Sequence, residues 1–494
     1  MVGPDFKEPR VPAPETWNKN DPRIATQTAV DTVWWKAFHD PAIDRLVEIA
    51  YQQNLPLQVA ALRIMEARAQ LAISVGKQYP QFQEAFGSAM AVGLSSTAPN
   101  IANLPVQHFG DYQLGFDAVW ELDFWGKYRR GVQSDAAHAF ATIADYYAEV
   151  VSLTAEVVRT YVVIRTTEVL IAQAQENVRI QEEGLAIAQS RFRNGATPEL
   201  DPTQAETLLE STRATIPPLQ IQLEQARNAL STLLGAPAGS VDALLAGSTQ
   251  IPLAPATVAV GVPAEVLRRR PDIRSAELNA AAQCAQIGVA KADLYPSFSI
   301  AGMIGLETSN SSQGWAGLSS GSLFYSIGPQ FHWALLNYGR ITNNVRVQDA
   351  RFQQLLVGYH NTVLKALQEV EDALSGFANA QNAVVPGQNA VTSAQKAVTI
   401  SVAAYREGAV DYQRVLDSER ALLQEQNALA NTLSSVDTNL IALYKALGGG
   451  WELRQGQPLV PDHTRREMED RTNWGDMLSH PVAPATANPS PNHR

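Results

Sequence analysis

The 494-residue sequence has a single cysteine, Cys284, so neither an intrachain disulfide nor a cysteine-based metal cluster can form. It has no run of about 18 apolar residues, which excludes a membrane-spanning helix but not a membrane β-barrel, whose strands alternate. Positive charge is scarce, because 38 Lys and Arg face 49 Asp and Glu and give a net charge of -11. That balance excludes a broad phosphate-binding surface, so we expect no nucleic acid partner.

Catalytic motifs are also lacking. There is no Gly-rich phosphate loop ending in Lys-Ser/Thr, and the eight histidines form no His-x-x-x-His pair. A G-x-S-x-G run at 317–321 lies in a Gly/Ser-rich connection between expected strands rather than at a strand-to-helix elbow, so we interpret it as a loop. We expect neither enzymatic activity nor a cofactor or metal.

The sequence does contain an internal repeat with an offset of 213 residues. Three anchors share this offset: Arg-Asn-Gly-Ala at 193–196 and Arg-Glu-Gly-Ala at 406–409, Leu-Gly at 234 and 447, and Trp at 120 and 333. The chain is therefore a tandem duplication.

Both copies predict the same order of elements. A helix ends at a Tyr-Pro pair, because proline disfavours the helical conformation of the residue before it. Two strands follow, and the alternation of apolar residues from Tyr112 to Trp120 is typical of a strand with two different faces. A long helical hairpin completes the copy. The expected bounds are a helix at 41–78, strands within 81–124 and a hairpin at 127–234, then a helix at 263–294, strands within 297–336 and a hairpin at 340–447.

The first helix of each hairpin would extend on the order of 100 Å. Every seventh residue from Ile143 to Phe192 is apolar, and so is every matching position from Leu356 to Tyr405. A strict seven-residue repeat predicts left-handed coiled-coil packing against neighbouring helices.

Two features depart from this regular pattern. Pro217-Pro218 and Pro386 fall inside expected helices, and interior proline predicts kinks or interruptions there. Residues after about 455 become polar and rich in Pro and Asn, which predicts a disordered tail.

Four strands are too few to close a barrel, which needs about eight, and an open sheet would expose its edges. Three chains would supply twelve strands and a tube of coiled helices, so we expect a homotrimer. Aromatic residues lie in or beside the strands, where the interfacial girdle of a membrane barrel is expected: Tyr112, Trp120, Trp125, Trp315, Tyr325 and Trp333. The alternative is a soluble sheet with these aromatics in its core.

Four motifs carry a family resemblance. They are Val-Gly-Pro-Asp-Phe at 2–6, Leu-Arg-Arg-Arg-Pro-Asp-Ile-Arg at 267–274, Ala-Lys-Ala-Asp-Leu-Tyr-Pro at 290–296, and Tyr-Arg-Glu-Gly at 405–408 with Val-Leu-Asp at 415–417. Together with the duplication, they span about residues 2–455. The chain resembles the TolC-like outer-membrane factors, specifically the NodT-type lipoproteins of tripartite efflux pumps.

The resemblance implies a mainly α fold with membrane β structure, in which a trimeric 12-stranded β-barrel stands on a long periplasmic α-helical coiled-coil barrel. It places an equatorial belt in residues 1–40, 236–262 and 449–494, the last range including the disordered tail. The implied partners are a periplasmic adaptor (membrane fusion) protein, an inner-membrane RND-type pump and outer-membrane lipid. Family members carry an acylated cysteine, for example with palmitate, before the Val-Gly-Pro-Asp segment. Met1 stands there, so we expect a lipid anchor on a native cysteine that this sequence lacks.

The resemblance also places a closed periplasmic aperture at the hairpin ends, with an aperture aspartate at Asp417. The candidate gate residues are Asp417, Arg414, Asp201, Asp411 and Arg420. By the offset, Arg414 corresponds to Asp201 and Asp417 to Gln204, so we hypothesise a ring of ion pairs between neighbouring tips. The alternatives are helix N-caps for Asp201 and Asp411, and a solvated helix face for the others.

The two hairpin turns resemble the tips that this family presents to its adaptor. The residues concerned are Arg193, Gly195, Arg406 and Gly408, and simple helix termination is the other interpretation. The expected function is a passive outer-membrane exit duct for small molecules such as drugs. A type I protein-secretion outlet and a periplasmic coiled-coil scaffold without a pore remain alternatives.

Overall fold

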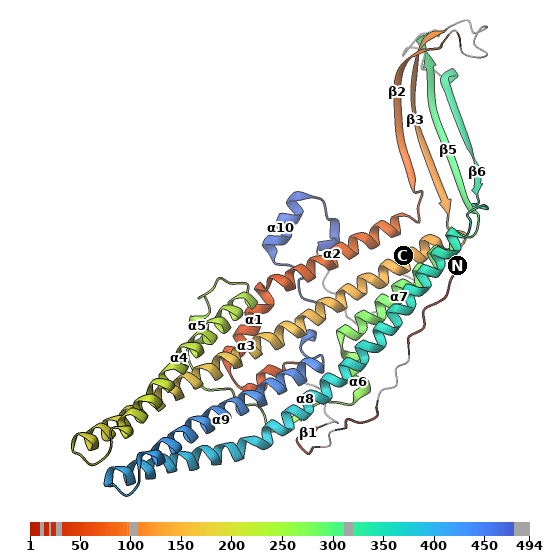
Figure 1. Ribbon diagram of the computed structural model, residues 1–494. Helices are drawn as coiled ribbons and strands as arrows, with labels where there is room; N and C mark the ends of the chain where they lie inside the picture. The colour runs from red at the N-terminus through yellow and green to blue at the C-terminus, as the bar shows by residue number, and fades with distance from the viewer. Residues whose placement is uncertain are drawn as a thin grey trace.

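The computed structural model describes residues 1–9, 14–18, 21–25, 32–95, 97, 107–310 and 320–478. Within these ranges the chain is mainly helical, and a four-stranded sheet projects from one end of a long helical body (Figure 1). Trp315 and most of the 317–321 run lie outside the described residues. None of the described helices combines the length and the apolar character needed to cross a bilayer.

The two copies contain equivalent elements. The first has α1 (Pro41–Gln53), α2 (Leu55–Gly76), β2 (Phe82–Gly93), β3 (His108–Leu122), α3 (Lys127–Arg193) and α4 (Leu200–Leu233). The second has α6 (Pro263–Arg269), α7 (Pro271–Ala292), β5 (Ser297–Ser309), β6 (Leu323–His332), α8 (Arg340–Glu407) and α9 (Tyr412–Ala446). Shorter elements surround the middle of the body: β1 (Ile24–Ala25), η1 (Trp34–Phe38), α5 (Asp242–Leu245), β4 (Val258–Ala259), η5 (Trp451–Arg454), α10 (Asp462–Arg471) and η6 (Gly475–Leu478).

The single helices expected at 41–78 and 263–294 are each divided in two. Asn54 separates α1 from α2, and its Oδ1 accepts a hydrogen bond from the Leu57 N–H at 2.8 Å. Arg270 separates α6 from α7 in an extended conformation, because Pro271 follows it.

Each break lets a short helix stack end to end on the last helix of its own copy. Asn54 Nδ2 donates to the Leu233 carbonyl at 2.9 Å and joins α2 to α4, while Arg270 Nη1 donates to the Ala446 carbonyl at 2.7 Å and joins α7 to α9. The repeated Leu-Gly pair lies at these joints. Gly235 has a φ of +65°, and a Cβ there would overlap the Gln53 carbonyl, so the joint requires glycine.

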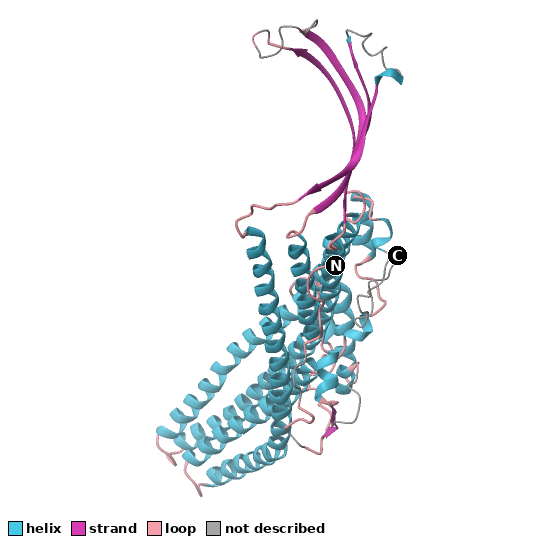
Figure 2. Cartoon of the chain, turned by 90° about the vertical axis from the view of Figure 1, so that its right-hand side faces the viewer, coloured by secondary structure: helices cyan, strands magenta, loops and turns pink. Residues whose placement is uncertain are grey.

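The four long strands form one antiparallel sheet in the order β2-β3-β5-β6. Figure 2 shows that the sheet is curved. This order leaves β2 and β6 as the two edges within the protomer. A short parallel pair, β1 with β4, was not predicted and joins the N-terminal segment to the linker between the copies.

The heptad positions form much of the core. Val150, Val157 and Ile164 are buried in α3, and Val370 and Phe377 are buried in α8. The largest cluster lies at the middle of the body, where η1, α1, the linker and η5 wrap around the helices. The heptad pattern therefore identified the packing faces of both long helices.

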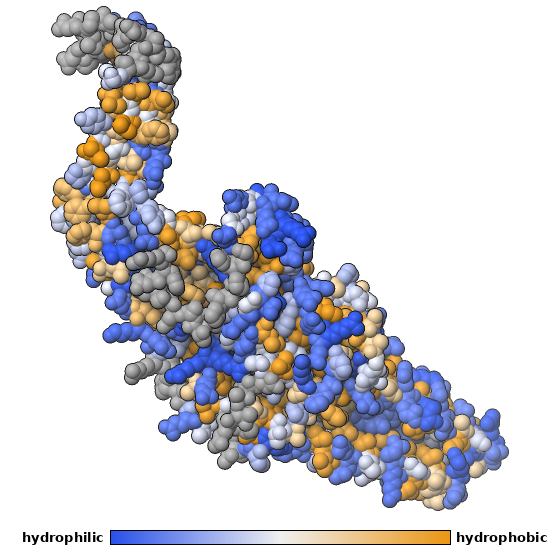
Figure 3. All heavy atoms as spheres, turned by 180° about the vertical axis from the view of Figure 1, so that it is seen from behind, coloured by the Kyte–Doolittle hydropathy of each residue, from blue (hydrophilic) through white to orange (hydrophobic). Residues whose placement is uncertain are grey.

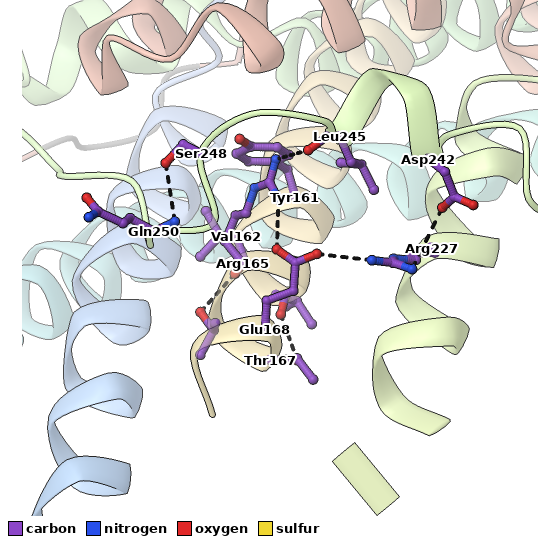
Figure 4. A network of polar contacts seen from close by, with 12 residues as sticks. Tyr161, Val162, Arg165, Thr167, Glu168, Arg227, Asp242, Leu245, Ser248 and Gln250 are labelled. Carbon is purple, nitrogen blue, oxygen red and sulfur yellow. Dashed lines mark hydrogen bonds and ion pairs between the residues drawn. The ribbon is translucent and has the colours of Figure 1, made fainter. Parts of the chain in front are cut away.

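A buried ion network ties the first hairpin to the linker (Figure 4). Arg165 is buried, and it donates to Glu168 at 2.7 Å and to the Leu245 carbonyl at 2.6 Å. Arg227 of α4 reaches the other oxygen of Glu168 at 3.1 Å. Such a network resists removal of any one member, because the remaining charges would be buried without partners.

The second copy lacks this network. Ala378, Gln381 and Leu440 stand at the positions that correspond to Arg165, Glu168 and Arg227. At these positions the second hairpin is instead tied to the N-terminal segment, because Arg23 donates to the Ala378 carbonyl at 3.3 Å and to Gln381 Oε1 at 3.1 Å.

The interruptions expected at the interior prolines do not occur. Helix α4 continues through Pro217-Pro218 and α8 through Pro386, so neither helix is interrupted. These prolines are exposed, and the carbonyl groups that lose an N–H partner can bind water instead. The disorder expected after about 455 is also wrong as far as residue 478, because α10 and η6 are formed and bury Met468 and Leu478.

We predict that Arg270→Met destabilises the fold by about 2 kcal/mol, because the Ala446 carbonyl would be buried without its donor. Glu369 would also lose its 2.8 Å ion pair with Arg270. The measurement is the thermal unfolding midpoint in detergent. Arg268→Met is the matched control, because Arg268 is exposed in the same segment and should unfold like the wild type. An equal drop in the unfolding midpoint of both variants would contradict the role of Arg270 as the hydrogen bond donor to the Ala446 carbonyl.

Candidate functional site: a two-faced sheet and paired helical tips

The sheet has two chemically different faces. The strand register places a broad set of apolar side chains on one face: Leu114, Phe116, Trp120, Ile300, Ile304, Leu306, Tyr325, Ile327 and Phe331. The opposite face carries polar side chains that include Glu84, Gln113, Asp117, Glu307 and Gln330. Figure 3 shows hydrophobic residues gathered along this arm of the molecule. Such a sheet suits a wall between lipid and an aqueous lumen.

The aromatic residues in the described strands lie at two levels. Tyr112 and Tyr325 lie toward the end of the sheet far from the helices, and Trp120 lies near the helices. Tyr112 and Trp120 share a face eight residues apart, or about 27 Å at about 3.4 Å per residue. This separation is close to the apolar band of about 25 Å in membrane barrels.

Three tryptophans gather at the junction of sheet and helices. The indole N–H groups of Trp120, Trp125 and Trp333 each donate to a backbone carbonyl, at 3.3 Å, 2.8 Å and 3.1 Å respectively. Trp125 also stacks on Tyr295 with ring centroids 4.5 Å apart. These contacts fix the junction and leave the indole rings at one level, as in an interfacial girdle.

The two hairpin tips lie together at the opposite end of the molecule (Figure 1). Gly195 and Gly408 have φ values of +73° and +79°, and both turns close with a backbone hydrogen bond of 2.9 Å from the next alanine. Arg193 and Arg406 beside them are exposed. The turns thus terminate the helices and present arginine to solvent at the same time.

The expected gate residues on the second hairpin are exposed. Asp417 accepts a hydrogen bond from Gln413 Nε2 at 2.8 Å, and within the described part of the protomer Arg414 and Arg420 form no ion pair. Asp411 occupies the N-cap position of α9, but its side chain makes no capping hydrogen bond. Asp201 is not an N-cap, because Glu199 holds that position and Asp201 lies in the first turn of α4.

Asp201 instead joins the two hairpins. Its Oδ2 accepts a hydrogen bond from the Tyr405 hydroxyl at 2.9 Å. Arg191 of the first hairpin donates to the Tyr405 carbonyl, and its guanidinium lies 4.7 Å from the centre of the Tyr405 ring. Burial, together with the hydrogen bond to Asp201, raises the pKa of Tyr405 to about 12. The first hairpin therefore holds Tyr405 from both sides.

Tyr405 and Arg191 are the residues that sequence reasoning missed. Tyr405 was counted as an apolar heptad position, equivalent to Phe192 in the first copy, and as part of the Tyr-Arg-Glu-Gly motif, but no contact was predicted for its hydroxyl group. Phe192 is 40% exposed, whereas Tyr405 is 1% exposed. The hydroxyl group at an otherwise apolar heptad position was the available signal.

In the part of the chain that the structure describes, no three His, Cys, Asp or Glu side chains are grouped to hold a metal ion. The geometry offers a two-faced sheet at one end and a polar tie between hairpins at the other.

Comparison with known proteins agrees with this geometry. The sequence profile described as "Outer membrane efflux protein" matches residues 46–236 and 262–449. The chain belongs to this family. The family match confirms the resemblance found in the sequence, and it makes the chain an outer-membrane efflux channel protein in a family that serves transport rather than catalysis. An efflux channel is therefore favoured over a type I protein-secretion outlet and over a periplasmic coiled-coil scaffold without a pore.

Relatives and solved structures match over most of the chain. "Probable outer membrane lipoprotein SilC" of Salmonella typhimurium is 30% identical over 455 residues, 91% of this chain and 95% of that protein. "Nodulation protein T" of Rhizobium leguminosarum bv. viciae is 29% identical over 451 residues, 91% of each chain. The structure of the outer-membrane channel OprN aligns with a TM-score of 0.85 at 32% identity, covering 91% of this chain and 99% of that one.

We predict that Tyr405→Phe loosens the tips, because the first hairpin loses its hydrogen bond to the second. A loss of about 1 kcal/mol corresponds to roughly fivefold faster amide exchange at residues 403–412. The measurement is hydrogen exchange with mass spectrometry in detergent. Asp411→Asn is the control, since its carboxylate caps nothing and should leave exchange unchanged. Unchanged exchange in Tyr405→Phe would show that the hydroxyl does not restrain the tip.

Proposed function

We propose that three copies assemble head to tail into a 12-stranded β-barrel continued by a helical tube, which serves as a passive exit duct for small molecules such as drugs. The observation that carries this proposal is the strand order. It leaves the outer edge of β2 and the outer edge of β6 without a hydrogen-bonded neighbour in the described protomer. Pairing of β2 in one copy with β6 in the next is a heterologous contact, and a closed ring of three satisfies every edge.

The helical body supports the same arrangement. Contacts between helices place α2 and α4 along one side of the protomer and α8 along the other, with α3, α7 and α9 between them. Both sides carry exposed apolar side chains: Val59, Ile73 and Ile221 on one, and Val357, Leu364, Val385 and Ile400 on the other. Head-to-tail packing would cover both sets at once.

The tips would form the periplasmic gate of this trimer. Exposed Asp417 and Arg414 would face their symmetry copies or the neighbouring Asp201, with Arg420 and Asp411 nearby, and the tie to Tyr405 would hold each tip closed. The turns at Arg193, Gly195, Arg406 and Gly408 would meet a periplasmic adaptor, through which an inner-membrane RND-type pump delivers the transported molecule.

The N-terminal segment would attach the duct to the membrane. The Val2 N–H donates to the Trp125 carbonyl at 2.9 Å, so the start of the chain lies at the junction of sheet and helices. A lipid on a residue preceding Val2 would enter the bilayer at that level. The described segments at 14–18, 21–25, 236–262 and 449–478 surround the middle of the body and would form the equatorial belt.

Single-channel conductance in planar bilayers tests the duct and its gate. We predict that the purified wild type inserts and gives small, mostly closed currents, and that Asp417→Ala and Arg414→Glu give larger currents because the closed ring loses charge pairs. Arg466→Glu on α10 is the control for charge reversal away from the tips and should match the wild type.

Each other outcome rejects a stated part of the proposal. Failure of all proteins to insert would favour the scaffold without a pore. Large, ungated wild-type currents, or an Arg414→Glu variant identical to the wild type, would keep the channel and reject this gate.

A further inference from the structure

Helix α9 buries two carboxyl groups: Glu419 has no hydrogen bond partner in the described structure, and Asp437 has a hydrogen bond to the backbone of Ala254. Glu419 is 2% exposed, and neither of its carboxyl oxygens has a hydrogen bond partner in the described structure. Asp437 is 1% exposed, and its Oδ2 is likewise without a partner. An ionised carboxyl in such a place is strongly disfavoured, because water has been removed and no opposite charge replaces it.

The duplication shows that burial of these groups is particular to the second hairpin. The corresponding residues of the first copy are Glu206 and Glu224, and both are exposed in the protomer. The difference follows from position, because α9 lies between α3 and α8 whereas α4 lies at the side of the protomer. The chain thus provides its own matched comparison for each buried acid.

Glu419 lies where the two hairpins touch. A Cβ added to Gly184 of α3 would lie 3.3 Å from Glu419 Oε1 and 3.2 Å from the Tyr412 hydroxyl, so both groups pack against the first hairpin at that glycine. Gln181, one turn earlier in α3, is 2% exposed, and neither its amide nitrogen nor its oxygen has a partner. These neutral groups can pack against a protonated carboxyl group. They supply no positive charge to stabilise an ionised one.

The ionisable groups around this contact are already engaged or uncharged. On α9 itself the neighbour is Tyr412, a neutral phenol whose ring packs against Tyr405 of α8. Arg191 of α3 and Asp201 of α4 both bind Tyr405 at the tip. On the α8 side, Ser401 bonds to Ser418, next to Glu419. No described element therefore brings a cation to Glu419.

Burial raises the pKa of Glu419 to about 7 and that of Asp437 to about 8. An exposed glutamate has a pKa of about 4.3. The packed arrangement therefore binds a proton more tightly than one in which Glu419 reaches water. Raising the pH from about 4.5 to about 7 therefore weakens the packing of α9 on α3. Above about pH 7 Glu419 is ionised in both arrangements, so a further rise in pH causes no further change in the packing free energy from this residue.

We propose that Glu419 is a proton-held latch, whose neutral carboxyl lets α9 pack on α3 at Gly184 and whose deprotonation releases the tip of the second hairpin. The second hairpin is the one to move, because it carries the buried Glu419, whereas the corresponding Glu206 of the first hairpin is exposed. Asp437 lies farther along α9, toward the middle of the body, and its deprotonation also favours release of α9. This inference rests on the proposed duct for its functional meaning, since the tips close a lumen only in that assembly.

Hydrogen exchange tests the latch directly in the full-length protein in detergent. After correction for the intrinsic pH dependence of exchange, residues 178–190 and 410–422 of the wild type should lose protection as pH rises from 5 to 7, by at most about tenfold per pH unit. Glu419→Gln, which is neutral at every pH, should keep the protection seen at pH 5. Glu206→Gln should behave like the wild type.

A second variant, Glu419→Leu, tests whether the amide group introduced by Glu419→Gln itself disturbs the packing. Glu419→Leu also removes the titrating group, so it should show the same flat profile as Glu419→Gln. Equal pH dependence in the wild type and in both Glu419 variants would overturn the latch.

Bilayer recording separates failure of the latch from failure of the duct. The wild-type open probability should rise between pH 5 and pH 7, whereas Glu419→Gln should stay mostly closed throughout. Conducting channels with the same pH dependence in both proteins would reject the latch and keep the duct. If neither protein conducts, the duct is rejected, and the exchange profiles still decide whether Glu419 controls hairpin packing.

Discussion

The edge of a β-sheet cannot face hydrocarbon, because its backbone N–H and C=O groups would have no partners there. Each protomer has two such edges, β2 and β6, on a sheet whose apolar face needs lipid or another apolar surface. One chain cannot satisfy both demands with four strands. In the proposed assembly the need to pair these edges makes the protomer part of a ring, and that ring would hold the helices that follow the strands in a tube.

The duplication supplies two similar hairpins, but the two copies differ in the polar contacts that hold them. In the first copy, Arg165, Glu168 and Arg227 tie the hairpin to the linker. In the second, these charges are absent, and α9 instead carries buried acids at its contacts. The tie from Asp201 and Arg191 to Tyr405 spans the two hairpins at the tip. The two hairpins therefore differ in how they are held, and only the second buries an acid at its contact with the first.

Much of the fold could be predicted because its signals are periodic. The offset of 213 residues, the heptads and the strand alternation identified every long element, since each pattern reports which face is buried. The break at Arg270 was missed although Pro271 after it is a local signal like that of the Tyr-Pro pairs. The contacts of Asn54 and Arg270 with Leu233 and Ala446 could not be predicted, because these residues are distant in sequence. Helix α10 was missed because its polar composition resembles that of a disordered segment. At the tip, exposed charges were found from the motif, whereas Tyr405 and Glu419 owe their significance to burial that the sequence does not record.

The central claim is that the edges β2 and β6 are satisfied by neighbouring copies. The most direct measurement is the number of chains in the detergent-solubilised particle, obtained by native mass spectrometry. The account predicts three chains per particle across the concentration range in which the particle is stable. A monodisperse monomer or dimer that retains the folded sheet would contradict it, because the edges would then be paired in some other way.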